Sequence, residues 1–171
     1  LAMIRAQLDE GALKQAWDGM NDSFDRLWWT NSTGMWENTK PRIIAGDPPY
    51  KVGVPPPEGN MTGSTSGGTV EFAETRVYTV TYVTGFNEEG PPGNVLTLTG
   101  NSNGSWTING INALTTPPGT WDNLARKRLY RTITTPTGVD FRLVQEWAIA
   151  AAPAVFNDTV SNETIASRPL L

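Results

Sequence analysis

The clearest hydrophobic pattern in the chain lies within residues 76–100. β-Branched and aromatic residues alternate over residues 77–83 (VYTVTYV), so either face of this segment could bury apolar surface, and the pattern predicts a strand. The turn sequence Asn-Glu-Glu-Gly at 87–90 and the two prolines after it end that strand, because proline cannot continue a hydrogen-bonded ladder. A second strand is predicted from Val95 onward.

Further strand-like segments follow at a regular spacing. They cover residues 105–111, 127–133, 140–149 and 154–160, and the loop at 134–138 has a common hairpin length. This spacing predicts an antiparallel β-sandwich. The side chains expected in its core are Tyr78 or Tyr82, Val80, Trp106, Ile108, Leu129, Phe141 or Leu143, and Phe156.

A different period governs the start of the chain. Apolar residues recur at mostly three- and four-residue steps and predict an amphipathic helix over residues 1–24, although Gly11 and Gly19 could divide it into two shorter helices. Residues 27–37 then predict a strand, a turn and a second strand. The apolar residues that recur at the helical spacing are Leu1, Ile4, Leu8, Leu13, Trp17, Met20, Phe24, Leu27 and Trp28.

Aromatic residues are concentrated in this N-terminal part, which holds four of the seven tryptophans. Burying one large ring is worth about 1.5–3 kcal/mol, so either the β domain or a neighbouring chain must cover them. We predict an interface with other chains. Its candidate residues are Trp17, Phe24, Trp28, Trp29 and Trp36.

The distribution of proline and glycine suggests three regions. Six prolines fall between Pro41 and Pro57, and residues 52–57 (VGVPPP) predict a stiff, extended strap. Residues 1–57 would then form a docking arm of helix, β-hairpin and proline-rich strap. Residues 58–68 would be a flexible polar linker, and residues 69–171 the sandwich.

Composition excludes several classes of function. The chain has no cysteine and no histidine, which excludes thiolate catalysis, zinc fingers and Ser-His-Asp triads. A net charge of −4 with scattered basic residues does not favour nucleic-acid binding, and no apolar run is long enough to span a membrane. We expect no enzymatic activity and no catalytic, cofactor-binding or metal-binding residue.

Two charged clusters could suggest chemistry. Neighbouring residues of an extended segment point to opposite sides, so Glu88 and Glu89 predict a solvated turn rather than a glycosidase pair, whose carboxylates must face each other. The basic triplet at 126–128 could hold an acidic partner, but a sheet edge guarded by charge is the simpler interpretation.

Three segments resemble a fibronectin type III domain. They are KRLYRTITTPTGVDFRLVQEW, AVFNDTV, and RVYTVTYVTGFNEEGPPGN, the last being similar to that family's penultimate strand and the turn after it. Here that element comes first, as if the sandwich began with its sixth strand. The matching positions of the first two segments are Leu129, Tyr130, Arg131, Phe141, Leu143, Val144, Phe156, Asp158 and Thr159.

The rotated order, together with the upstream RLWWT and YKVGVPPP, resembles a group of tailed-phage structural proteins. The resemblance implies a mainly β protein: a fibronectin type III/Ig-like antiparallel β-sandwich with an N-terminal helical, aromatic-rich arm. It also implies a non-enzymatic virion component of a tail, neck or fibre attachment, assembled in the bacterial cytoplasm with copies of itself and other virion proteins. The alternative is a carbohydrate-binding or adhesion module that binds a host surface glycan.

Overall fold

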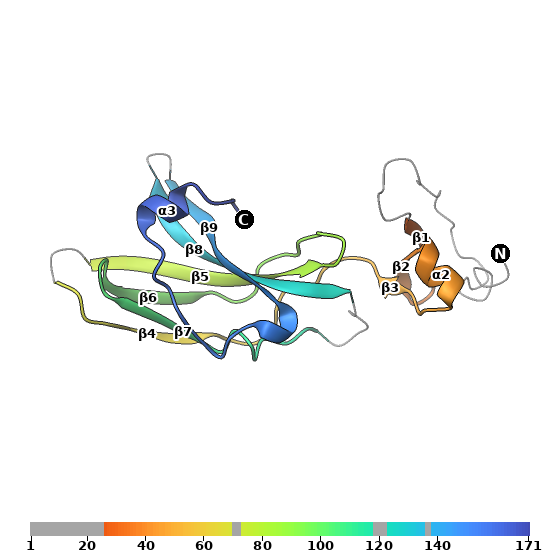
Figure 1. Cartoon of the computed structure of the whole chain (residues 1–171), viewed down its shortest axis with the longest axis horizontal. Helices are drawn as coiled ribbons and strands as arrows, with labels where there is room; N and C mark the ends of the chain where they lie inside the picture. Colours follow the sequence, from red (N-terminus) through yellow and green to blue (C-terminus); the bar gives the residue numbers. More distant parts are fainter. Residues whose placement is uncertain (1–25, 70–72, 118–122, 136–137) are drawn as a thin grey trace. The chain divides into compact units, whose positions relative to one another are not determined.

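The computed structural model describes residues 26–69, 73–117, 123–135 and 138–171. The described chain is mainly β, with antiparallel sheets (Figure 1), as the sequence predicts. It divides into two compact units. We call residues 26–53 the hairpin unit and the described residues of Val54–Pro118 and Leu124–Leu171 the sandwich unit. The predicted helix over residues 1–24, with Trp17 and Phe24, lies outside the described residues.

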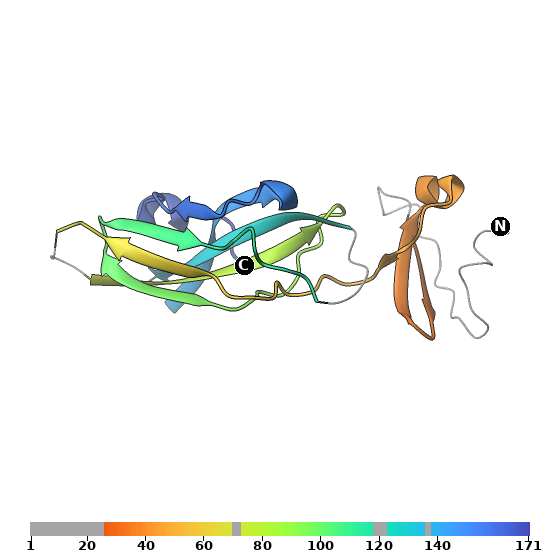
Figure 2. The ribbon, with the colours of Figure 1, turned by 90° about the horizontal axis from the view of Figure 1, so that it is seen from below.

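The described part of the sandwich unit has seven strands in two sheets (Figures 1 and 2). The four-stranded sheet has the order β6-β5-β8-β9, and the three-stranded sheet has the order β10-β7-β4. Every strand pair is antiparallel. The bounds are β4 (Thr62–Ser66), β5 (Ala73–Thr84), β6 (Leu96–Asn101), β7 (Ser105–Asn109), β8 (Leu124–Thr135), β9 (Gly138–Ala148), η1 (Ile149–Ala151), β10 (Val155–Asn157) and α3 (Asn162–Ala166).

The core of the sandwich unit contains most of the predicted side chains. Val80, Trp106, Ile108 and Leu129 are each at most 1% exposed, which confirms the predicted inward phase of β5, β7 and β8. Both candidate tyrosines of β5 are buried, because each hydroxyl finds a partner: Tyr78 donates to the Asp158 carboxylate and Tyr82 to the Leu114 carbonyl, both at 2.9 Å. Phe156 is partly buried against this core, with its ring edge-on to Trp147.

Strand β9 corrects one prediction. Phe141 and Leu143 are only half-buried, and the fully buried residue is Val144. The reason is a β-bulge: Leu129 lies opposite Gln145 while Tyr130 lies opposite Leu143, so Val144 is an extra residue on β9. A bulge shifts the alternation of side chains, and the apolar pattern of β9 does not reveal where that shift occurs.

The predicted linker over residues 58–68 is wrong for most of its length. Strand β4 occupies Thr62–Ser66 and pairs with β7, and Met61 just before it is buried in the core. Residues 62–66 (TGSTS) are small and polar, so their side chains carry no strand signal. Backbone hydrogen bonds to β7 hold the segment instead.

The end of the predicted proline strap also belongs to the sandwich unit. Pro55 and Pro57 are buried. A Cβ atom added at Gly90 would lie 2.6 Å from a methyl carbon of Val54, and one at Gly93 would lie 2.7 Å from the Pro57 carbonyl oxygen. Glycine at these two positions therefore lets the strap pack closely on the segment after β5. The sandwich unit begins at Val54, earlier than the predicted residue 69.

The hairpin unit confirms the predicted strand, turn and strand. Strands β1 (Arg26–Asn31), β2 (Gly34–Thr39) and β3 (Tyr50–Lys51) form one antiparallel sheet. The proline-containing segment before the predicted strap holds helix α2 (Lys40–Ala45), which has Pro41 in its first turn and ends at Gly46 with a φ of 82°, as helices commonly do. No helix among the described residues is long and apolar enough to cross a membrane.

Candidate functional site

Three of the five predicted interface residues lie in the hairpin unit. Trp29 is 2% exposed and packs with Leu27 and Ile43, and Trp36 packs partly against them. Trp28 points to the opposite face of β1, because successive residues of a strand alternate, and the Arg26 guanidinium lies 5.0 Å from its ring centroid. Trp29 thus belongs to the unit's own core, while Trp28 and Trp36 are half-buried.

Apolar surface remains uncovered on the hairpin unit. Ile44 on α2 is 72% exposed and Met35 on β2 is 36% exposed. The buried core of this unit consists of Leu27, Trp29 and Ile43, which is small for a unit so rich in aromatic residues. Met35 and Trp28 lie on the same face of the β1–β2 hairpin, since their cross-strand partners are Thr30 and Glu37, whereas Trp36 lies opposite Trp29 on the core face. The candidate docking surface is therefore the hairpin face with Trp28 and Met35, together with Ile44 on α2.

The two neighbouring glutamates have different hydrogen-bond partners. Glu89 accepts hydrogen bonds from the Thr81 hydroxyl, the Tyr130 hydroxyl and the Arg128 guanidinium, each at 2.6 Å. Glu88 instead accepts a long bond, 3.4 Å, from the Thr84 hydroxyl. Glu89 is an exposed residue, as a solvated turn predicts, but its carboxylate is bound by protein donors and its side chain is 25% exposed.

These contacts set the charge state of Glu89 and its neighbours. Burial by itself would raise the Glu89 pKa, but the hydrogen bonds from Thr81, Tyr130 and Arg128 outweigh it and lower that pKa. The pKa of Tyr130 is raised, first by burial and then by its bond to Glu89. At neutral pH, Glu89 is a carboxylate whose oxygens are occupied by protein donors.

The basic triplet is divided between the two faces of β8, a central strand rather than the predicted sheet edge. Arg128 donates to Glu146 at 2.6 Å as well as to Glu89, and Arg126 lies 3.6 Å from Glu146. Because their charges are already compensated by carboxylates, these arginines offer little attraction to an acidic partner.

Lys127 points the other way, into the protein, and is 2% exposed. Its ammonium donates to the carbonyl oxygens of Ile111, Asn112 and Leu114 at 2.8, 3.2 and 3.0 Å. Burial lowers the pKa of this group. The three carbonyls satisfy the three donors of the ammonium, so Lys127 fastens the loop after β7 rather than serving a ligand.

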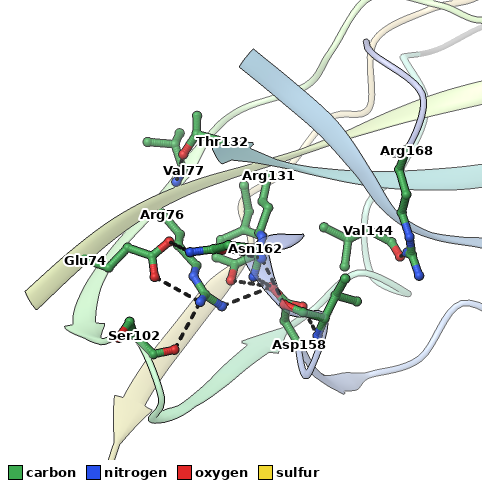
Figure 3. A network of polar contacts seen from close by, with 12 residues as sticks. Glu74, Arg76, Val77, Ser102, Arg131, Thr132, Val144, Asp158, Asn162 and Arg168 are labelled. Carbon is green, nitrogen blue, oxygen red and sulfur yellow. Dashed lines mark hydrogen bonds and ion pairs between the residues drawn. The ribbon is translucent and has the colours of Figure 1, made fainter. Parts of the chain in front are cut away.

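A buried ionic cluster lies at the other end of β5 (Figure 3). Asp158 follows β10 and is held by its own backbone, since its N–H donates to the Trp106 carbonyl at 2.9 Å. Its Oδ2 atom accepts from Tyr78 at 2.9 Å and from Arg131 at 2.6 Å, and lies 3.5 Å from Arg76. We call Arg76, Tyr78, Arg131 and Asp158 the inner cluster.

The two arginines of the inner cluster also reach other segments. Arg131 donates to the Val160 carbonyl at 2.9 Å and to the Asn162 side chain at 2.8 Å. Arg76 donates to Glu74 and Ser102 (Figure 3), and its guanidinium lies 4.1 Å from the centre of the Trp106 ring.

Electrostatics within the inner cluster follow from burial and pairing. Burial would lower the Arg76 pKa, but hydrogen bonds to Glu74 and Tyr78 raise it overall. The Tyr78 pKa is raised by burial and by the Asp158 charge. Arg76 was missed by sequence reasoning, although it occupies the same inward phase of β5 as Tyr78 and Val80, where a charged residue signals a buried partner.

A groove adjoins the inner cluster. It has a volume of about 580 Å³ and is lined by Arg76, by residues 102–106 of the β6–β7 turn and β7, and by residues 157–162 between β10 and α3. Such a volume lies within the range of small-molecule sites. Among the described residues, no group of three or more Asp or Glu side chains is placed to hold a metal ion.

No protein-family model matches this chain, and a search of curated proteins finds no match.

Proposed function

We propose that this chain is a non-enzymatic structural subunit of a bacteriophage virion, in the tail, neck or a fibre attachment. It binds copies of itself and other virion proteins through the hairpin unit. The observation that carries the proposal is the exposed apolar surface of that unit. Half-buried Trp28 and Met35, which is 36% exposed, share one face of the hairpin, and Ile44 on α2 is 72% exposed. Aromatic and aliphatic side chains that stay exposed on a small unit favour a protein contact.

We also propose that the sandwich unit is of the fibronectin type III kind, with a rotated strand order. In support, the segments that carry the resemblance become β8, β9 and β10 in sequence, and β5 lies beside β8. Seven described strands divided between sheets of three and four agree with such a sandwich.

A carbohydrate-binding module built on a tryptophan platform is less favoured. Trp106 is 1% exposed, and Trp147 packs edge-on against Phe156 with ring centroids 5.0 Å apart. Trp106 is therefore not accessible for stacking on a sugar, and Trp147 is half-buried.

The test is the mass of the particle in solution, measured by sedimentation over a range of concentrations. We expect the full chain to form a multi-copy assembly. The double variant Trp28→Ser/Ile44→Ser should weaken it at least about tenfold, since interface aromatics commonly contribute more than 1 kcal/mol each.

The matched control is Val139→Ser, which removes an exposed aliphatic side chain, 64% exposed, from the sandwich unit. It should leave the assembly unchanged. A full chain that stays monomeric at every concentration, or a control that disrupts assembly as strongly as the double variant, would contradict the proposal.

A further inference from the structure

The groove beside the inner cluster has walls that are fixed by internal hydrogen bonds. On one side, the Asn103 side chain accepts from the Thr69 N–H at 3.1 Å and donates to the Thr69 hydroxyl at 3.0 Å. On the other side, the Ser161 hydroxyl accepts from the Thr164 N–H at 3.1 Å. A groove held in this way needs little reorganisation to receive a ligand.

Several exposed polar groups along these walls have no protein partner among the described residues. The hydroxyls of Ser105 and Thr159 line the groove, are exposed, and make no hydrogen bond within the described residues. Asn157 uses its side-chain oxygen to accept from Thr107 at 2.9 Å, and its NH₂ group has no protein partner in the described part of the chain. Hydroxyl and amide groups are therefore presented from both walls, β7 and the segment after β10.

The groove carries no net charge. Its ionic lining residues are Arg76 and Asp158, which pair with each other at 3.5 Å. Asp158 is fully buried, so it is not available to a cation, and Arg76 is already engaged by Glu74 and Asp158. A phosphate or a metal ion would find no uncompensated charge here.

We propose that this groove binds a neutral, polyhydroxylated ligand, namely a sugar unit of a glycan. The hydroxyls of Ser105 and Thr159 and the amide of Asn157 offer donors and acceptors of the kind that bind a sugar, and the volume suits a small molecule. Without an exposed aromatic face the affinity rests on hydrogen bonds alone, so binding should be weak. The proposal is independent of the proposed virion role.

The experiment is saturation-transfer NMR on the full chain, which observes the sugar and works whether the protein is a monomer or an assembly. The probes are glucose, galactose and N-acetylglucosamine, one disaccharide built from each of these sugars, and inorganic phosphate. We expect transfer to at least one neutral sugar. The double variant Ser105→Ala/Thr159→Ala should weaken this binding about tenfold or more, since it removes two hydrogen bonds. Comparison of monosaccharide with disaccharide separates a single-ring site from one that follows a glycan chain.

The control variant is Ser64→Ala, which removes an exposed hydroxyl from β4 and should not change binding. A second variant, Ser105→Trp, should abolish binding by filling the groove. The proposal is overturned if no neutral sugar gives a signal, if phosphate competes with the sugar, or if both groove variants bind normally. It is also overturned if Ser105→Trp changes only the assembled mass, because the groove would then be a protein contact.

Discussion

Two ionic clusters lie on opposite faces of the same four-stranded sheet, and they differ in their contact with water. The side chains of the inner cluster are almost inaccessible: Arg76 is 4% exposed, and Arg131 and Asp158 are 0% exposed. On the other face, Glu89, Arg128 and Glu146 form what we call the outer cluster, with exposures of 25%, 27% and 31%.

The comparison shows that burial, rather than residue type, decides what a charge contributes. Arg128 and Arg131 lie on the same strand, and each has a carboxylate at 2.6 Å. An exposed ion pair is screened by water and contributes little, whereas removing one partner of a buried pair leaves an uncompensated charge. The inner cluster should therefore be far more sensitive to substitution than the outer one.

The largest expected effect is at the centre of the inner cluster. Asp158→Ala removes the carboxylate shared by Arg76 and Arg131 and leaves two buried guanidinium groups without it. The free energy of unfolding should fall by about 3–5 kcal/mol, measured by urea denaturation.

Asp158→Asn separates charge from shape in the same position. It keeps an oxygen that can accept from Tyr78 and Arg131, so its loss should be smaller than that of the alanine variant. If Asp158→Ala costs less than about 1 kcal/mol, the inner cluster behaves like a surface pair and the contrast between the two clusters fails.

An apolar neighbour provides the reference for that effect. Leu129 is 0% exposed and shares the inward face of β8 with Arg131. Leu129→Ala should lower the free energy of unfolding by about 2–5 kcal/mol, because it removes buried carbon and leaves a cavity. A loss below about 0.5 kcal/mol in urea melts would mean that the inward phase of β8 is wrong.

Period-two patterns made much of the sandwich predictable. Trp106, Ile108 and Leu129 are buried as their alternation indicates, and the hairpin of β1 and β2 follows from its turn residues. Strand β4 could not be predicted in this way, since TGSTS has no apolar alternation and is held by its backbone. The position of the β9 bulge likewise depends on pairing with β8, which no local pattern encodes.

The candidate sites were harder to predict for a related reason. Arg76 and Asp158 are 82 residues apart in sequence, and Glu89 and Tyr130 are 41 apart. The sequence shows that these residues are charged or polar, but only the strand order β5-β8 and the path of β10 bring them together. No sequence pattern links Glu89 to the basic triplet, whereas in the structure Arg128 donates to Glu89.

The smallest expected effect is at the outer cluster, and it depends on pH. The Glu89 pKa is lower in the folded protein than in the unfolded chain, so ionised Glu89 stabilises the fold at pH values above its unfolded pKa of about 4.3. That contribution should be lost progressively as the pH falls through the lower folded pKa.

At pH 7, Glu89→Gln should cost about 1–2 kcal/mol, allowing for solvent screening of a partly exposed group. In urea melts, the difference between wild type and this variant should shrink from pH 7 to pH 3. Glu146→Gln, at a more exposed position, should cost less than about 1 kcal/mol at pH 7. A Glu89→Gln difference that stays constant down to pH 3 would show that the charge of Glu89 contributes nothing, and that only its hydrogen-bond geometry matters.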